Sequence, residues 1–199
     1  LEEARRRLLR SLRRDGFWEA EVAPPEVAEV TGNSATVRLA VDKGRCWRLD
    51  LERLPQSRAL EREALPFLRG EEQFSEATLP LNVARVRTFL QRRGRLLAAV
   101  AGEVDESGEC RTLRLRVDHD EKTPIRAIRF PGLDELEAEA LRARIGARLG
   151  HPWWWGREPI DDDSLAADTS SVRATLLDDG YAEATVAAPR LSAEDGGVA

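Results

Sequence analysis

The stretch Gly16–Val22, GFWEAEV, decides the fold, because the chain carries the same pattern three times. Gly94–Val100 reads GRLLAAV and Gly180–Val186 reads GYAEATV, so every copy fits G-x-x-x-A-x-V. The first two glycines are 78 residues apart, and the second and third are 86 residues apart. Self-similarity at near-constant spacing indicates an array of one structural unit. The sequence therefore predicts small repeats rather than one or two ordinary domains.

The residues before each glycine predict a helix. Apolar residues stand four and eight positions ahead of each glycine, at Leu12 and Leu8, Leu90 and Val86, and Leu176 and Val172. This spacing places them on one helical face, and glycine is favoured just past a helix C-terminus. The alternation of apolar and polar residues after each glycine predicts a strand. Each copy is expected to contain a helix, a glycine turn and a strand.

The residues that follow complete the unit. Residues 37–42 and 113–118 alternate apolar and polar residues, as a half-buried strand does. Turn residues precede both segments and predict a hairpin. A further strand and a helix are expected beyond each hairpin: strands at Trp47–Leu54 and Ile125–Phe130, helices with Leu60, Ala64, Leu65 and Leu68 and with Leu136, Ala140, Leu141 and Ile145. The unit is thus strand, helix, helix, strand, strand.

This unit divides the chain into three parts. Residues 1–44 are predicted to be a partial repeat with the second helix and the hairpin. Residues 45–121 form a complete repeat, and residues 122–199 form a repeat whose last strand is absent or truncated. Half a unit cannot bury its own sheet face. We therefore expect the natural polypeptide to be longer, at least at its N-terminus.

Composition excludes several classes of function. Hydrophobic residues make up 42% and charged residues 34% of the chain, and no run reaches the ~18 apolar residues of a membrane helix. The formal net charge of −5 gives no basic footprint for nucleic acid. The two histidines and two cysteines lack metal-ligand spacing. No phosphate loop, dinucleotide fingerprint or catalytic constellation is present, so we predict no enzyme, no metal and no cofactor.

The order βααββ, with G-[FY]-x-x-A-x-V after the second helix, resembles the POTRA (polypeptide-transport-associated) domain. The best matches are Gly16–Val22 and Gly180–Val186, and Ile125–Gly132 is similar to a POTRA first strand running into its turn. The middle copy departs from the pattern, with Arg95 where an aromatic residue is usual. The resemblance implies an α+β fold of tandem βααββ POTRA repeats, each a three-stranded mixed sheet covered by two helices on one face.

The resemblance also implies a sheet order. The second strand lies at one edge, the third in the middle and the first on the far side, parallel to the third. Cys46 and Cys110 stand at the starts of a first and a third strand of one unit. Their Cα atoms would then lie within the ~4.4–6.8 Å reach of a disulfide. The alternative is two free thiols.

Tandem POTRA domains are typical of outer-membrane β-barrel assembly proteins of the BamA and TamA type. The resemblance implies a periplasmic array that binds unfolded outer-membrane proteins or accessory assembly proteins, ahead of a membrane barrel in the same polypeptide. Two alternatives remain open at this stage. One is the POTRA region of a two-partner secretion transporter that recognises one exported substrate, and the other is a stand-alone adaptor array.

The strands after the repeated glycines are the candidate binding sites. An open sheet edge can recruit an extended peptide through its backbone N–H and C=O groups. The candidate edge residues are Ala20 and Val22, Ala98 and Val100, and Ala184 and Val186. The alternative is that these edges are merely tolerated, with Pro24 and Pro25 blunting the first.

Two further clusters have a functional and a structural interpretation. Trp153–Trp155 lies between two predicted helices, and Trp154 and Trp155 are candidates for contact with a partner or a lipid interface. The alternative is a hydrophobic plug over the helix pair. Asp161–Ser164 is interpreted as a helix N-terminus, where negative residues are favoured. The arginines of residues 5–14 are interpreted as the solvated face of a helix.

Overall fold

The computed structural model describes residues 1–31, 34–54, 57–119, 121–122, 129–134, 137–141, 162–190, 193–194 and 197–198. It divides into two compact units. The first comprises Leu1–Phe89 with Val100–Asp118, and the second comprises Leu90–Ala99 with His119–Ala199. The predicted repeat boundaries after residues 44 and 121 stay predictions.

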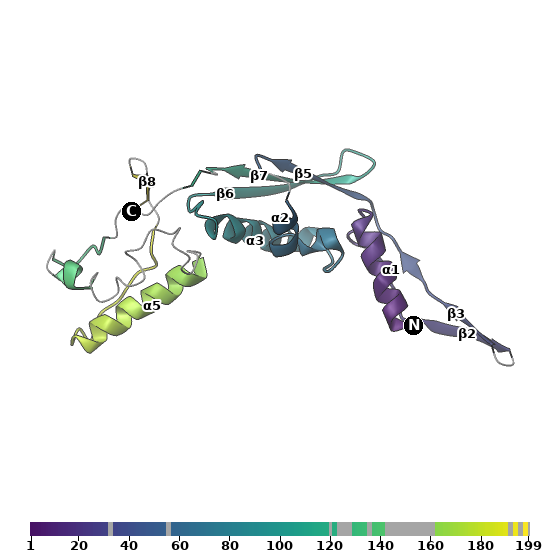
Figure 1. The fold of residues 1–199 in the computed structure, drawn as a ribbon, viewed down its shortest axis with the longest axis horizontal. Coiled ribbons are helices and arrows are strands. Elements are labelled where there is room, and N and C mark those ends of the chain that lie inside the picture. The colour runs from purple at the N-terminus through teal and green to yellow at the C-terminus, as the bar shows by residue number, and fades with distance from the viewer. Residues whose placement is uncertain are drawn as a thin grey trace. The chain divides into compact units, whose positions relative to one another are not determined.

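The second repeat has the predicted order of elements. It runs β5 (Trp47–Glu52), α2 (Arg58–Glu63), the 3-10 turns η1 (Pro66–Arg69) and η2 (Glu76–Thr78), α3 (Leu79–Gln91), β6 (Ala99–Asp105) and β7 (Arg111–Asp118). The sheet order is β5-β7-β6, and β5 is parallel to β7 from Trp47 opposite Arg111 to Glu52 opposite Arg116. Figure 1 shows α2 and α3 on one face of this sheet. The α+β class and the βααββ order are confirmed.

The alternation along β7 explains why this sheet is covered on one face. Leu113, Leu115 and Val117 are fully buried, whereas Arg114 and Arg116 between them form ion pairs with acidic side chains. Successive side chains of a strand point to opposite faces. The apolar face of β7 therefore joins a core that also contains Leu60 and Phe67.

The first predicted helix of this repeat is interrupted at Pro66. The pattern of Leu60, Ala64, Leu65 and Leu68 predicts one continuous helix, but α2 ends at Glu63 and η1 begins at Pro66. Proline lacks an N–H group and excludes the residue before it from the helical region. Leu65 accordingly has φ −127° and ψ 59°. Of the residues in this pattern, Leu60, Ala64 and Leu65 are still buried, whereas Leu68 is half-buried.

The first repeat contributes one helix and a broken hairpin. Its elements are α1 (Glu2–Arg14), β1 (Glu21–Val22), β2 (Glu26–Thr31), β3 (Ser34–Arg38) and β4 (Val41–Asp42). β1 pairs with β4 and β2 pairs with β3, so the strand predicted at residues 37–42 is wrong as one continuous element. Pro24 and Pro25 lie between β1 and β2 and cannot donate to the ladder. Figure 1 shows the paired strands β2 and β3 side by side.

The second unit contains α5 (Asp162–Asp178), a helical turn at residues 137–141, and the short strands β8 (Ala193–Glu194) and β9 (Gly197–Val198). The start of α5 agrees with the interpretation of Asp161–Ser164 as a helix N-terminus. Val172 of α5 is buried, and the Tyr181 hydroxyl donates a 2.8 Å hydrogen bond to Glu137. Residues 125–128 of the predicted strand at Ile125–Phe130 lie outside the described residues.

Candidate polypeptide-binding edge

The strand β6 forms the longest candidate edge. It spans seven residues and stands at the end of the order β5-β7-β6, so one of its sides has no neighbouring strand among the described residues. Ala98, just before β6, is buried, while Val100 within it is half-buried. An edge strand presents backbone N–H and C=O groups along its free side. Of the three predicted edges, this one is long enough to pair with an extended peptide.

Ion pairs span the sheet face that α2 and α3 do not cover. Arg114 on β7 lies 2.6 Å from Glu103 on β6 and 3.2 Å from Asp50 on β5. The pKa of Arg114 is raised, chiefly by the hydrogen bond to Glu103 and next by the hydrogen bond to Asp50. Exposed pairs of this kind contribute little to stability. Their effect is to hold the charged side chains of β5, β6 and β7 against one another across this face of the sheet.

The end of β6 is fixed by a side-chain turn. The Ser107 N–H donates a 2.9 Å hydrogen bond to Oδ1 of Asp105. The hydrogen bonds from Ser107, first its side chain and then its backbone, lower the pKa of Asp105. Aspartate side chains commonly close turns in this way. Asp105 therefore marks where the edge strand stops and the loop to β7 begins.

We expect NMR titration of the Asp105 carboxyl to give a midpoint below 3.8, its usual value. Because the folded pKa is lowered, the contribution of this turn to stability is present above the unfolded pKa and is lost as the pH falls through the folded pKa. Ser107→Ala should move the midpoint back toward 3.8. A midpoint at or above 3.8 in the unmodified chain would contradict the turn.

The first predicted edge, at Ala20 and Val22, is closed. Both side chains are buried, and β1 has only two residues. The backbone oxygens beside them are already bonded, because Arg5 Nη1 donates to the Val22 carbonyl at 2.9 Å and Arg13 Nη2 donates to the Ala20 carbonyl at 3.3 Å. Sequence reasoning missed this role of the two arginines. Their i, i+8 spacing on one helical face was the available signal.

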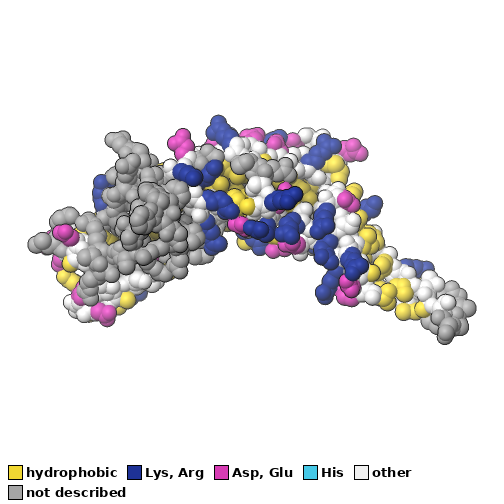
Figure 2. Space-filling model, viewed as in Figure 1, with side chains coloured by type: hydrophobic (Ala, Val, Ile, Leu, Met, Phe, Trp, Pro, Cys, Tyr) yellow, Lys and Arg dark blue, Asp and Glu magenta, His cyan; other side chains and the backbone are white. Residues whose placement is uncertain are grey.

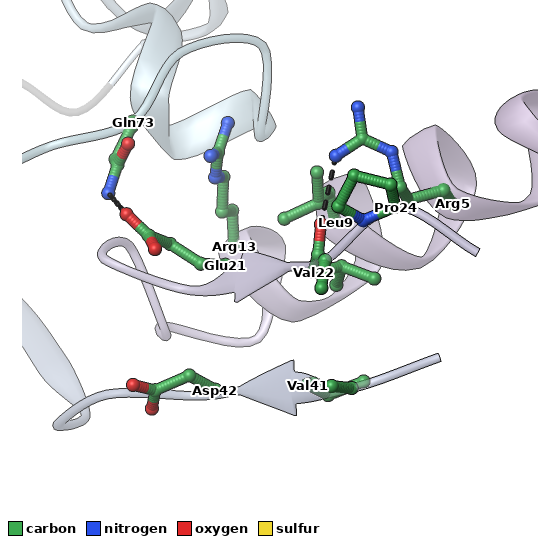
Figure 3. Close-up of a pocket in the computed structure, with 11 residues that line it drawn as sticks. Arg5, Leu9, Arg13, Glu21, Val22, Pro24, Val41, Asp42 and Gln73 are labelled. Atoms are coloured by element: carbon green, nitrogen blue, oxygen red, sulfur yellow. Dashed lines mark hydrogen bonds between the residues drawn. The ribbon is translucent and has the colours of Figure 1, made fainter. Parts of the chain in front are cut away.

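These contacts belong to an open groove of about 550 Å³ between α1 and the β1–β4 pair. Figure 3 shows Arg5 reaching the Val22 carbonyl and Gln73 reaching Glu21, at 2.9 Å and 3.3 Å. The lining residues are Arg5, Leu9, Arg13, Glu21, Val22, Ala23, Pro24, Ala40, Val41, Asp42 and Gln73. Side chains of both signs line it, and burial lowers the pKa of Arg13. Its charged lining consists of the basic Arg5 and Arg13 and the acidic Glu21 and Asp42.

The interpretation of a solvated helix face holds for the exposed arginines of α1 but not for the half-buried Arg5 and Arg13; the exposed ones are Arg6, Arg7, Arg10 and Arg14. Arg5 lies 2.8 Å from Glu2, and Arg7 pairs with Glu3 one turn away. Figure 2 shows basic side chains intermixed with acidic ones over the described surface in view. The hydrogen bond that Arg5 donates to Glu2 is the main cause of a lowered pKa for Glu2. The charge of this helix is therefore partly neutralised by its own carboxylates.

The third predicted edge is not formed as a strand. Ala184 and Val186 are half-buried in a segment without strand pairing among the described residues. The residues downstream pair with each other instead, as β8 with β9. A strand needs a partner to satisfy its backbone groups. The prediction of an edge at Ala184–Val186 is corrected on this point.

The remaining predicted residues fall in two groups. Trp154 and Trp155 lie outside the described residues. Cys46 and Cys110 are joined by a disulfide with a Cα–Cα distance of 4.7 Å.

In the described part of the chain, no group of three or more His, Cys, Asp or Glu side chains could hold a metal ion. None of the described helices is long and apolar enough to cross a membrane.

The chain is similar to a known protein sequence and to a solved structure. An outer membrane protein assembly factor BamA from Nitratidesulfovibrio vulgaris is 26% identical over 128 residues, which are 62% of this chain and 16% of that protein. The chain therefore spans about a sixth of the length of the BamA protein that it matches. The predicted resemblance to a BamA-type protein is thereby confirmed. A crystal structure of POTRA3-5 of Haemophilus influenzae BamA aligns with 99% of this chain, and the alignment covers 76% of the chain in that structure. The TM-score is 0.45 and the sequence identity is 15%. No protein-family model matches.

Proposed function

We propose that this chain is the periplasmic POTRA array of an outer-membrane protein assembly factor, and that β6 binds unfolded β-barrel clients or accessory proteins by adding their strand to the sheet. The array would precede a membrane barrel in the same polypeptide. It would act by binding alone, without a catalytic site. The similarity to an assembly factor BamA supports this role over that of a secretion transporter.

The observation that carries the proposal is the open side of β6. β1 is short and its carbonyls accept hydrogen bonds from Arg5 and Arg13, whereas β6 offers seven residues in a row. Backbone pairing gives affinity without requiring a particular client sequence. Exposed Ala99 and Ala101 leave room beside the strand for a client's side chains. These features suit a surface that handles many unfolded barrel strands.

The proposal is tested by site-specific photo-cross-linking of the 199-residue chain with an outer-membrane β-barrel protein diluted from urea. A photo-reactive amino acid at Ala101 on β6 should capture the unfolded client. The matched position is Arg62 on α2, whose side chain is 65% exposed but lies on the helix layer. A third position, exposed Arg48 on β5, reports on the other edge of the same sheet.

Cross-links at Ala101 in large excess over Arg62 and Arg48 would support the proposal. Equal cross-linking at all three positions would indicate nonspecific adhesion, and capture at Arg48 alone would place binding on β5. Either result would overturn the assignment of β6. Capture of a single exported protein, with no reaction toward barrel clients, would favour the secretion transporter instead.

A further inference from the structure

Four aromatic rings form one buried cluster where the first and second repeats meet. Trp18 follows α1 in the first repeat, and Trp47, Phe67 and Phe74 belong to the second. Trp18 stacks on Trp47 with centroids 5.6 Å apart, and it meets Phe67 and Phe74 edge-on at 4.8 Å and 5.6 Å. We refer to these four residues as the aromatic joint. All four belong to the same compact unit of the chain.

Backbone hydrogen bonds also cross the joint. The Trp47 N–H donates to the Gly16 carbonyl at 2.8 Å, and the Phe74 N–H donates to the Trp18 carbonyl at 3.2 Å. The first bond involves the opening residue of β5, because β5 begins at Trp47. The position of the first repeat therefore depends on where the start of β5 is held.

The disulfide lies at that point. Cys46 immediately precedes Trp47, and Cys110 immediately precedes Arg111, the residue opposite Trp47 at the start of the parallel ladder. The guanidinium of Arg111 lies 5.3 Å from the ring centroid of Trp47, at the joint. It also reaches the first repeat, where it lies 3.6 Å from a carboxylate oxygen of Glu19. Of the two residues that follow the cysteines, Trp47 is thus part of the joint, and Arg111 contacts both the joint and the first repeat.

A ladder is weakest at its ends, because terminal pairs open without disturbing the rest. The disulfide cross-links the end of the β5–β7 ladder that carries Trp47 and Arg111. We propose that the Cys46–Cys110 disulfide locks the aromatic joint, so that the first and second repeats keep one relative orientation only while it is intact. This device is independent of client binding at β6.

The sequence restricts the lock to this junction. Counted from the repeat alignment of Leu49 with Ile125, the positions of Cys46 and Trp47 carry Lys122 and Thr123 at the next junction. The position of Trp18 carries Leu96 there. The disulfide and the stacked tryptophans therefore belong to the junction between the first and second repeats alone.

The test compares the unmodified 199-residue chain with the double variant C46S/C110S. Spin labels are attached through noncanonical amino acids, so that no cysteine is added. One pair, at Arg6 on α1 and Arg62 on α2, spans the joint, and both side chains are well exposed, at 72% and 65%. The matched pair, at Arg62 and Glu103, lies within the second repeat. Pulsed electron paramagnetic resonance measures both distance distributions under native conditions.

We expect the Arg6–Arg62 distribution to widen at least about two-fold in the double variant, because the freed ladder end no longer holds the joint. The Arg62–Glu103 distribution should stay unchanged. An unchanged Arg6–Arg62 distribution would overturn the proposal, because the aromatic joint would then hold without the disulfide. Widening of both pairs would also overturn it, because the disulfide would then maintain the fold of the second repeat rather than the joint.

Discussion

Trp18→Ala should lower the free energy of unfolding by about 3–5 kcal/mol, the usual cost of truncating a buried large aromatic residue. Trp18 is 4% exposed and contacts the other three rings of the aromatic joint. Removing the indole leaves a cavity against the three rings of the second repeat that Trp18 contacts. Urea denaturation followed by far-ultraviolet circular dichroism measures the loss without relying on tryptophan fluorescence.

The neighbouring Phe17 supplies the matched control. Phe17 is half-buried, and its ring lies 5.4 Å from the ammonium group of Lys43. Phe17→Ala removes an aromatic ring, a phenyl rather than an indole, one residue away and without opening the joint. We expect a loss of about 1–2 kcal/mol, since only part of its apolar surface is removed from water in the folded chain. Equal losses for the two variants would show that the joint adds nothing beyond ordinary burial.

The sequence predicted the repeat well because its signals are local. Glycine after a helix, apolar residues four apart and alternation in a strand depend on neighbours within a few positions. The parallel pairing of β5 with β7 follows from the resemblance that those signals support. The same kind of local signal explains the two corrections at proline. Pro66 interrupts a helix that the apolar pattern alone predicts to be continuous, and Pro24–Pro25 separate β1 from β2, whose partners β4 and β3 divide the strand predicted at residues 37–42.

Burial could not be predicted from repeat position. Val41 and Val117 match in the repeat alignment, yet Val41 is 42% exposed and Val117 is fully buried. β7 lies between β5 and β6, whereas β4 pairs only with β1 among the described strands. Alternation decides which side chains share a face of the strand, but whether that face is buried depends on the elements that cover it. The sequence alone could not distinguish these two valines.

The candidate site was predictable only in part for the same reason. The strand pattern gave three equivalent edges, but whether an edge is available depends on side chains from elsewhere. The Val22 carbonyl accepts a hydrogen bond from Arg5, 17 residues earlier in the chain. The aromatic joint brings together residues as far apart as Trp18 and Phe74. Neither contact has a periodicity that a single sequence displays.

Gly70→Ala is expected to lower the free energy of unfolding by about 2–5 kcal/mol, because two effects act at this one position. Gly70 has φ +73°, a left-handed conformation that costs an L-residue about 1–2 kcal/mol. A Cβ there would also lie 2.6 Å from the Arg10 carbonyl oxygen and 2.9 Å from its Cα, so the backbone of α1 must move away from η1. Overpacking of this kind adds about 1–3 kcal/mol.

Gly44→Ala separates the two effects within the same unit. Gly44 has φ +62°, but its Cβ would be nearest to atoms of Glu19, of which Cβ is the closest, at an ordinary 3.4 Å. It therefore carries the conformational cost without the clash, and we expect a loss of about 1–2 kcal/mol in the same denaturation experiment. The Arg6–Arg62 distance should lengthen in Gly70→Ala but not in Gly44→Ala, because α1 is displaced only in the former. Similar stability and similar Arg6–Arg62 distances in the two variants would mean that α1 does not pack against the turn at Gly70. The conclusion that the first repeat packs closely on the second would then be wrong.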